Sequence, residues 1–126
     1  TEATTFLTAE SRYEISTLSA ALSTRFVRIT LVNPMLTERV TIDLGLEYSD
    51  LMSGRNAKIE GMTIVEIKQD GNTSSMMKLI LRDMRIAPLK GSKYCLGTTL
   101  TVDNIKSNRF KEKIREIDKR LTRNKL

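Results

Sequence analysis

The segment ERVTIDLGLEY, residues 38–48, has the clearest strand pattern in this sequence. Apolar residues occupy every second position, and the positions between them are charged, polar or glycine. This period of two predicts a β-strand with one apolar and one polar face, as in an antiparallel sheet packed on a core. The apolar face is predicted to contain Val40, Ile42, Leu44, Leu46 and Tyr48, opposite Arg39, Thr41, Asp43, Gly45 and Glu47.

Other segments are expected to complete a sheet around this strand. RFVRITLV, residues 25–32, is β-branched and alternating, and an Asn-Pro turn follows it. MTIVEIKQ, residues 62–69, has the same character and ends at an Asp-Gly turn. A last short strand is predicted over residues 93–100, and residues 49–61 are predicted to form a loop.

Two helices are predicted outside the C-terminal region. The weak apolar pattern of residues 12–22 indicates a short N-terminal helix. A helix of about a dozen residues is predicted to run to Ile86, because Pro88 cannot continue it. The expected caps of this second helix are Asn72, Thr73 or Ser74. Its methionines, Met76, Met77 and Met84, are expected to pack in the core.

The C-terminal region is predicted to be a basic amphipathic helix that starts after Asp103 or Asn104. Its apolar residues fall on one stripe: Ile105, Phe110, Ile114, Ile117 and Leu121. Residues 104–126 contain nine basic and three acidic residues, whereas the rest of the chain has twelve of each. The net charge of +6 is therefore local, and any anion site elsewhere must come from a local arrangement of charges.

Composition excludes several classes of protein. The chain has a single cysteine, Cys95, so no intrachain disulfide can form, and a reducing, cytoplasmic setting is favoured. The Cys95 side chain is expected to be a small buried hydrophobe. No apolar run approaches the roughly 18 residues that a membrane span needs. The length of 126 residues predicts one domain, and the first residue, Thr1, suggests a processed or shortened piece of a longer chain.

Charged residues lie on or beside the predicted strands in three groups. Alternation places Arg28 with Phe26 and Thr30, Arg39 with Asp43, and Glu66 with Lys68, while Lys90 and Lys93 flank a flexible turn. Two interpretations stay open: a solvated polar sheet face, or a cavity that holds an anion. Arginine binds phosphate oxygens bidentately, lysine supplies a point charge, and a carboxylate among them can hold a metal that bridges phosphate oxygens.

The ordered segments RITLVN, ERVTIDL, IVEIK and LKGSKY, before a charged final helix, resemble the VTC domain of the CYTH-like, or triphosphate tunnel metalloenzyme, superfamily. The resemblance covers about Arg25 to about Arg120. It implies an α+β fold in which an antiparallel β-barrel, with flanking helices, forms a tunnel for triphosphate or polyphosphate. Residues 1–24 would be a helical or irregular N-terminal segment, and residues 25–126 the C-terminal half of the tunnel domain.

The resemblance also implies roles for individual residues. Glu66 would hold Mg²⁺ or Mn²⁺, and Asp43 would orient Arg39. The catalytic, phosphate-contacting residues would be Arg28, Arg39, Lys68, Lys90 and Lys93. The E-x-E-x-K type of motif found in the first half of superfamily members is absent from this sequence. This chain alone is therefore expected to be inactive, with its tunnel completed by an N-terminal half or by a second copy.

The function that the resemblance implies is that of a polyphosphate polymerase, which moves the γ-phosphate of ATP onto a polyphosphate chain. Such chemistry depends on in-line alignment and on neutralisation of charge by Arg, Lys and metal. Two alternatives remain. One is a tripolyphosphatase. The other is a non-catalytic basic module whose C-terminal helix binds an anionic lipid, a partner protein or nucleic acid. Nucleic acid is the least favoured of these ligands, because the excess positive charge is confined to this one segment.

Overall fold

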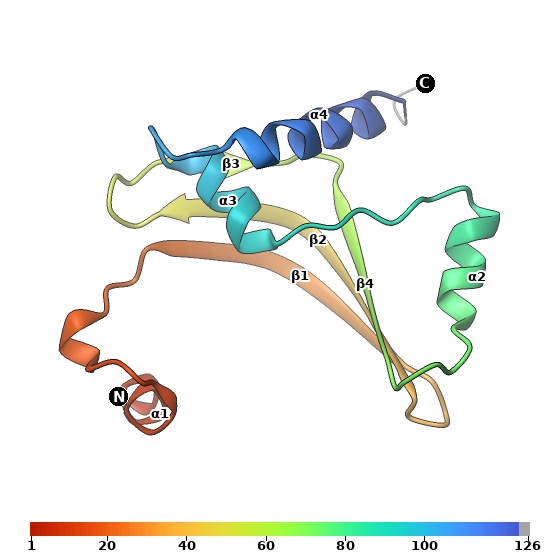
Figure 1. Cartoon of the computed structure of the whole chain (residues 1–126), viewed down its shortest axis with the longest axis horizontal. Helices are drawn as coiled ribbons and strands as arrows, with labels where there is room; N and C mark the ends of the chain where they lie inside the picture. Colours follow the sequence, from red (N-terminus) through yellow and green to blue (C-terminus); the bar gives the residue numbers. More distant parts are fainter. Residues whose placement is uncertain (124–126) are drawn as a thin grey trace.

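The computed structural model describes residues 1–123 as a four-stranded antiparallel sheet with four α-helices (Figure 1). The strands are β1 (Leu22–Val32), β2 (Glu38–Asp50), β3 (Asn56–Lys58) and β4 (Thr63–Gln69). The helices are α1 (Glu2–Glu10), α2 (Met76–Asp83), α3 (Lys93–Thr101) and α4 (Asn108–Arg123), with a short 3₁₀ turn, η1, at Ile15–Thr17. The expected α+β class with an antiparallel sheet is confirmed.

Strand β2 is the centre of the sheet. It pairs with β1 along one side and with β3 and β4 in succession along the other. Within the described part of the chain, no strand pairs with the outer edge of β1 or of β4. The sheet therefore does not close, as expected of half a tunnel.

The strand pattern of β2 is interrupted by a β-bulge at Gly45. The β1–β2 register shifts at Phe26, between Arg25 and Val27, so that Gly45 and Leu46 lie opposite a single residue. Gly45 has a φ of +62°, the left-handed conformation that glycine adopts most readily. A two-against-one arrangement with a left-handed glycine is a common bulge in antiparallel sheets, and it reverses the alternation of the side chains that follow.

The bulge determines which face of β2 is buried. Beyond it, Leu46 and Tyr48 lie on the same face as Asp43, because α3 packs on both Tyr48 and Asp43. Their predicted position on the face of Val40, Ile42 and Leu44 is therefore wrong. The physical reason is the extra residue at the bulge, which moves every later side chain to the opposite face.

A small core lies under α3 and α4 at this end of the sheet. Its fully packed residues are Leu46 and Tyr48 of β2 and Leu96 of α3. The surrounding half-buried hydrophobic residues are Leu22, Phe26, Ile59, Met62, Ile64, Leu100, Ile114 and Ile117. Burial of each large apolar side chain contributes about 1.5–3 kcal/mol, so this cluster is the main support of the fold.

Residues 93–100 form helix α3, so the strand predicted there is wrong. Ser92 caps the helix, and its side chain accepts a hydrogen bond from the backbone N–H of Cys95. Gly97 faces Tyr48 so closely that a Cβ at this position would lie 2.3 Å from the tyrosine ring. The cap starts the helix, and the missing side chain at Gly97 allows it to lie directly on β2.

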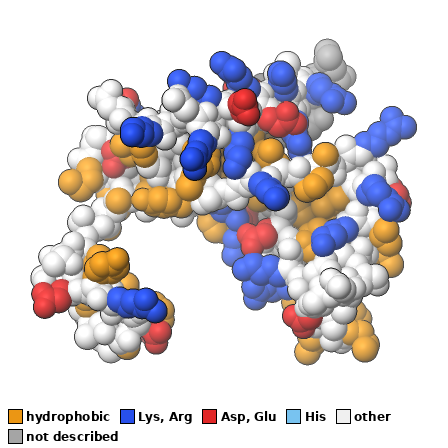
Figure 2. Space-filling view, viewed as in Figure 1, with side chains coloured by type: hydrophobic (Ala, Val, Ile, Leu, Met, Phe, Trp, Pro, Cys, Tyr) orange, Lys and Arg blue, Asp and Glu red, His pale blue; other side chains and the backbone are white. Residues whose placement is uncertain are grey.

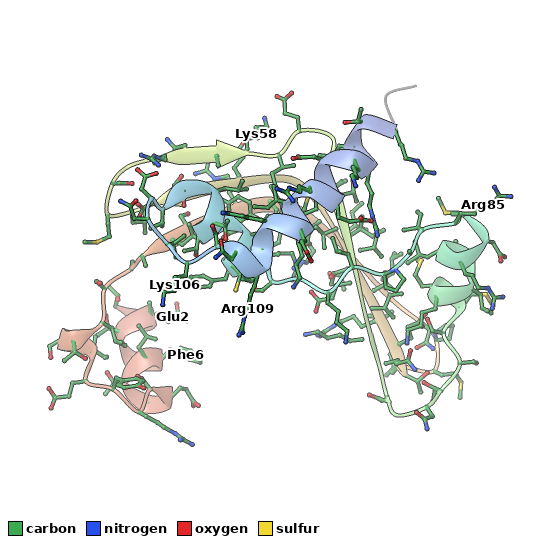
Figure 3. The ribbon with its side chains drawn as sticks, turned by 45° about the horizontal axis from the view of Figure 1, so that its top comes forward. Glu2, Phe6, Lys58, Arg85, Lys106 and Arg109 are labelled. Carbon is green, nitrogen blue, oxygen red and sulfur yellow. The ribbon has the colours of Figure 1, made fainter. Side chains whose placement is uncertain are left out.

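The other helices also differ from the predicted ranges. The N-terminal helix is α1, capped by Thr1 and not located at residues 12–22; it lies apart from the sheet (Figures 1 and 3). Helix α2 is shorter than expected because Ser75 caps it and Asp83 ends it. Helix α4 begins only at Asn108, so Ile105 lies outside its apolar stripe. The predicted loop at residues 49–61 contains the end of β2 and the short strand β3.

Two expectations about burial are wrong. Met76 is 68% exposed and Met84 is 62% exposed, because α2 lies beside the end of the sheet and not over it. Cys95 is only half-buried, on α3. Among the helices of the described chain, none has the length and apolar character needed to cross a membrane.

Candidate functional site

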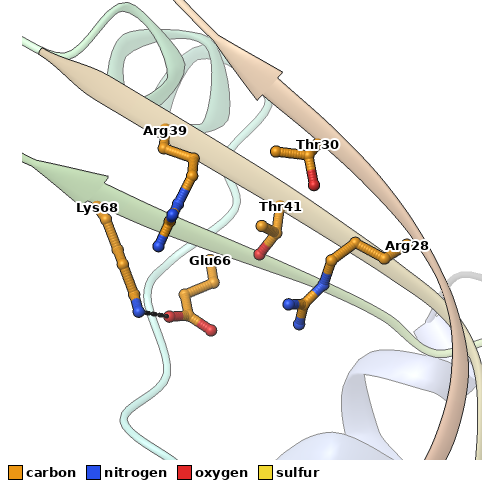
Figure 4. Close-up of a pocket in the computed structure, with 6 residues that line it drawn as sticks. All are labelled: Arg28, Thr30, Arg39, Thr41, Glu66 and Lys68. Atoms are coloured by element: carbon orange, nitrogen blue, oxygen red, sulfur yellow. Dashed lines mark ion pairs between the residues drawn. The ribbon is translucent and has the colours of Figure 1, made fainter. Parts of the chain in front are cut away.

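The polar part of the α3-facing side of the sheet contains a hollow of about 200 Å³ (Figure 4). It is lined by Arg28 and Thr30 of β1, Arg39 and Thr41 of β2, and Glu66 and Lys68 of β4. The strand register brings these residues together, because Thr41 lies between Thr30 and Glu66, and Arg39 lies opposite Lys68. Period-two alternation on three adjacent strands therefore forms the site.

Helix α3 contributes a further cation. The Nζ atom of Lys93 lies 2.9 Å from Oδ2 of Asp43 and 3.4 Å from Oε2 of Glu66. The Lys93 side chain is only 20% exposed. Because Lys93 is the first residue of α3, the helix that covers the core also places this ammonium group beside Glu66 of the hollow.

Asp43 is the buried anion at the centre of these contacts. Its carboxylate is 0% exposed and accepts two hydrogen bonds from Arg28, one from Nε at 2.6 Å and one from Nη2 at 2.8 Å. The Arg28 hydrogen bond is the main cause that lowers the pKa of Asp43 to about 2, against the effect of burial and with help from Lys93. The same hydrogen bond raises the pKa of Arg28.

The expected orientation of Arg39 by Asp43 is wrong. Asp43 lies opposite Arg28 in the β1–β2 ladder, whereas Arg39 lies four residues away along β2 and opposite Lys68. Both oxygens of Asp43 are occupied by Arg28 and Lys93. A sequence shows which residues share a face, but the partner across a ladder depends on a register that the turn and the bulge set.

Phe26 forms an apolar floor beneath two of the cations. The guanidinium carbon of Arg28 lies 4.8 Å from the ring centroid, and Nζ of Lys93 lies 5.9 Å from it. A cation over an aromatic ring gains about 0.5–1 kcal/mol at an exposed site and more where it is desolvated. Phe26 also packs against the core, so one side chain connects the core to the site.

Glu66 is the carboxylate that lines the hollow itself. Its Oε1 atom lies 3.4 Å from Nζ of Lys68, and its Oε2 atom lies 3.4 Å from Nζ of Lys93 (Figure 4 shows the Lys68 pair). Burial opposes ionisation of Glu66, but the hydrogen bonds and charges of Lys93 and Lys68 outweigh it and lower the pKa. Glu66 is therefore ionised at neutral pH.

The described residues contain no cluster of three or more His, Cys, Asp or Glu side chains that could enclose a metal. Mg²⁺ is commonly held by one or two carboxylates, with phosphate oxygens and water completing its coordination. Glu66, ionised and 42% exposed in the hollow, fits this role as a single protein ligand. Asp43 does not fit it, because Arg28 and Lys93 already occupy its oxygens.

The balance of charge in the site favours an anion. Arg28, Arg39, Lys68 and Lys93 give four positive charges against the two of Asp43 and Glu66. Asp43 is buried beneath Arg28, Glu66 lies in the middle of the hollow opposite Thr41, and among the described residues no ion pair involves Arg39. An anion with several oxygens could contact arginine donors at both ends of the hollow.

The family model of the VTC domain matches residues 3–102. The chain belongs to the VTC domain family. This confirms the resemblance seen in the strand motifs and places the chain in the context of polyphosphate metabolism. The match covers the sheet, the hollow and α3, and it ends before α4. No curated protein and no solved structure matches the chain.

In this VTC domain, the structure brings together five of the six residues that the sequence predicts for the site. They are Arg28, Arg39, Glu66, Lys68 and Lys93. Lys90 lies exposed on the segment before α3 and does not line the hollow. Thr41 was not predicted as a site residue, although its alternation with Arg39 and Asp43 indicated the same face.

Proposed function

We propose that this VTC domain binds the phosphate groups of polyphosphate or of a nucleoside triphosphate in the hollow, as part of a polyphosphate polymerase. The observation that supports this proposal is the convergence of four cations from three strands and one helix around a single space. Polyphosphate has a regular series of charged oxygens, and this ligand matches cations that are spread along a sheet better than a compact anion does.

The proposed roles follow from position. Arg28, Arg39, Lys68 and Lys93 bind phosphoryl oxygens, and Lys90 contacts the chain further out. Glu66 is one ligand of Mg²⁺ or Mn²⁺, and the metal when bound neutralises charge on the phosphate oxygens. The cations align a terminal oxygen of the polyphosphate chain with the γ-phosphorus of ATP. The new P–O bond forms as the bond from that phosphorus to the bridging oxygen breaks and ADP leaves.

We further propose that strands outside this chain complete the site. The open edges of β1 and β4 support this step, because an unpaired strand edge offers a row of backbone hydrogen-bonding groups to another strand. The added strands would come from an N-terminal half of the tunnel domain or from a second copy of this chain. The free cysteine, Cys95, suits a reducing compartment such as the cytoplasm.

Calorimetric titration of the whole protein with polyphosphate, in the presence of Mn²⁺, tests the proposal. Arg39→Ala and Lys93→Ala are each expected to weaken binding by about tenfold or more, because a hydrogen bond to a charged group is worth about 1.5–3 kcal/mol. Arg115→Ala is the matched control, since it removes an exposed cation of α4. Unchanged affinity in both site variants would show that the hollow does not bind the chain.

Product analysis separates the proposed reaction from the related hydrolysis. A polymerase given ATP produces ADP and longer polyphosphate, whereas a tripolyphosphatase given tripolyphosphate releases inorganic phosphate. A polymerase and a tripolyphosphatase would bind phosphate through the same cations, so the binding titration does not distinguish the two reactions.

A second candidate function rests on α4, whose exposed cations lie outside the family match (Figure 2). They are Arg109, Lys111, Arg115, Lys119 and Arg123, while Ile114 and Ile117 pack on the core. This surface would bind an anionic lipid, nucleic acid or an acidic partner. Its binding would fall steeply with salt and would survive Glu66→Ala, whereas charge reversal at Arg115 and Lys119 would abolish it.

A further inference from the structure

We propose that Asp43 is a positioning residue, which fixes the Arg28 guanidinium and the Lys93 ammonium in the orientations that bind phosphate. This inference rests on the proposed function of the hollow. Asp43 does not line the hollow and is fully buried, so it does not touch the ligand. It acts through two cations from different elements, Arg28 of β1 and Lys93 of α3.

The donors of Arg28 show how the orientation is set. A guanidinium group has five N–H donors in a rigid plane. Asp43 accepts from Nε and from Nη2, which occupies one edge of this plane. The two Nη1 donors and the second Nη2 donor are not used by Asp43. Because Arg28 lines the hollow, these donors are the ones that can bind a phosphate. Asp43 therefore determines which edge of the guanidinium is presented to a phosphate.

Lys93 is positioned by the same carboxylate. A lysine side chain has four rotatable bonds, and fixing it costs up to about 2 kcal/mol of rotamer entropy. The contact of Nζ with Asp43 at 2.9 Å fixes the ammonium group before any ligand arrives. One ammonium N–H is directed to Asp43, and the others can bind a phosphate oxygen or Glu66.

The electrostatic effect of Asp43 opposes its positioning effect, and this opposition makes the role testable. A carboxylate beside an anion site repels the ligand, so charge alone predicts that its removal strengthens phosphate binding. If Asp43 acts by positioning, its removal weakens binding although the site becomes more positive. The two explanations predict changes of opposite sign for Asp43→Asn.

The experiment measures tripolyphosphate binding by calorimetry with the whole protein. Asp43→Asn is expected to weaken binding by about tenfold or more. Asp103→Asn is the matched control, because it removes the same charge from the bidentate Arg55–Asp103 pair outside the site, and it is expected to leave affinity unchanged. Equal or tighter binding by Asp43→Asn would overturn the positioning role.

A second variant tests whether Arg28 and Asp43 act as a unit. Arg28→Lys keeps the positive charge but cannot make the paired hydrogen bonds with Asp43. Each single variant is expected to weaken binding, and the double variant is expected to be little weaker than either one. Additive losses would show that Asp43 does not act through Arg28.

An NMR measurement on the unmodified protein needs no variant and covers the case in which Asp43→Asn does not fold. The Nε–H resonance of Arg28 is expected to be shifted and protected from exchange, and to stay so when tripolyphosphate is added. Loss of protection on binding would overturn the inference.

If the unmodified protein binds no tripolyphosphate, the proposed function fails as well; if it binds and Asp43→Asn binds equally well, only the positioning role fails.

Discussion

Arg28 and Asp43 face each other across β1 and β2, with Nε of the arginine 2.6 Å from one carboxylate oxygen and Nη2 2.8 Å from the other. The carboxylate is completely buried, while the arginine side chain is 41% exposed. The pair thus spans the boundary between the interior and the hollow. The buried carboxylate therefore fixes the position of a guanidinium group at the surface.

The stability of the protein is expected to fall in acid because of Asp43. Its pKa is lowered to about 2 in the folded protein, so the unfolded chain binds this proton more readily and stability rises with pH. The contribution, about 2 kcal/mol, is present above about pH 5 and is lost as the pH falls toward 2. Urea unfolding at a series of pH values measures it. Asp43→Asn should remove this part of the pH dependence, and an unchanged profile in that variant would refute the assignment.

Gly97→Ala is expected to destabilise the protein by about 1–3 kcal/mol, the usual cost of overpacking a core. The new methyl group would lie 2.3 Å from the Tyr48 ring, so α3 must move away from β2. Because Lys93 belongs to α3, polyphosphate affinity should fall as well. Gly91→Ala is the control, since nothing lies within 4 Å of its Cβ position. Equal stability of the two variants in urea unfolding would contradict the packing of α3.

Gly45→Ala tests the bulge separately from packing. No atom lies within 4 Å of a Cβ at this position, so its expected cost of about 1–2 kcal/mol comes only from the left-handed backbone. Gly45→Asn should cost less, because asparagine tolerates this conformation better than alanine. Denaturant unfolding of both variants checks the order. If alanine is as well tolerated as asparagine, the backbone of β2 does not require glycine there.

Glu66→Gln is expected to change phosphate binding in opposite directions with and without metal. Without metal, the loss of a negative charge from the hollow should strengthen tripolyphosphate binding by about 1 kcal/mol or less. With Mn²⁺ present, the variant loses a metal ligand and should bind more weakly than the unmodified protein. Paired calorimetric titrations provide the comparison, with Glu47→Gln of the surface Glu47–Lys58 pair as the control. The same change under both conditions would rule out a metal at Glu66.

The strands and most of the site could be predicted from the sequence because alternation is a local property. Arg39, Glu66 and Lys68 needed only the period of two on strands that had strong β-branched patterns. The reversal of the side-chain alternation at Gly45 could not be predicted, since a bulge is defined by pairing with another strand. The partner of Asp43 could not be predicted for the same reason.

The error at residues 93–100 has a different origin. The segment KYCLGTTL is short and contains aromatic and β-branched residues, so its intrinsic pattern is ambiguous. Ser92 caps the helix, but the composition of the residues after it favours a strand. Lys93 lies beside the hollow, but it reaches it from a helix that covers the sheet and not from a strand within the sheet.

Helix α3 has Leu96 in the core and Lys93 at the hollow, less than one helical turn apart. Docking of this helix and occupancy of the hollow are consequently linked equilibria. A ligand that binds only when α3 is docked stabilises the folded chain by an amount that grows with the logarithm of its concentration. The melting temperature thus becomes a sensor of occupancy, and the increase measured for phosphate chains of graded length would rank them by affinity for the hollow.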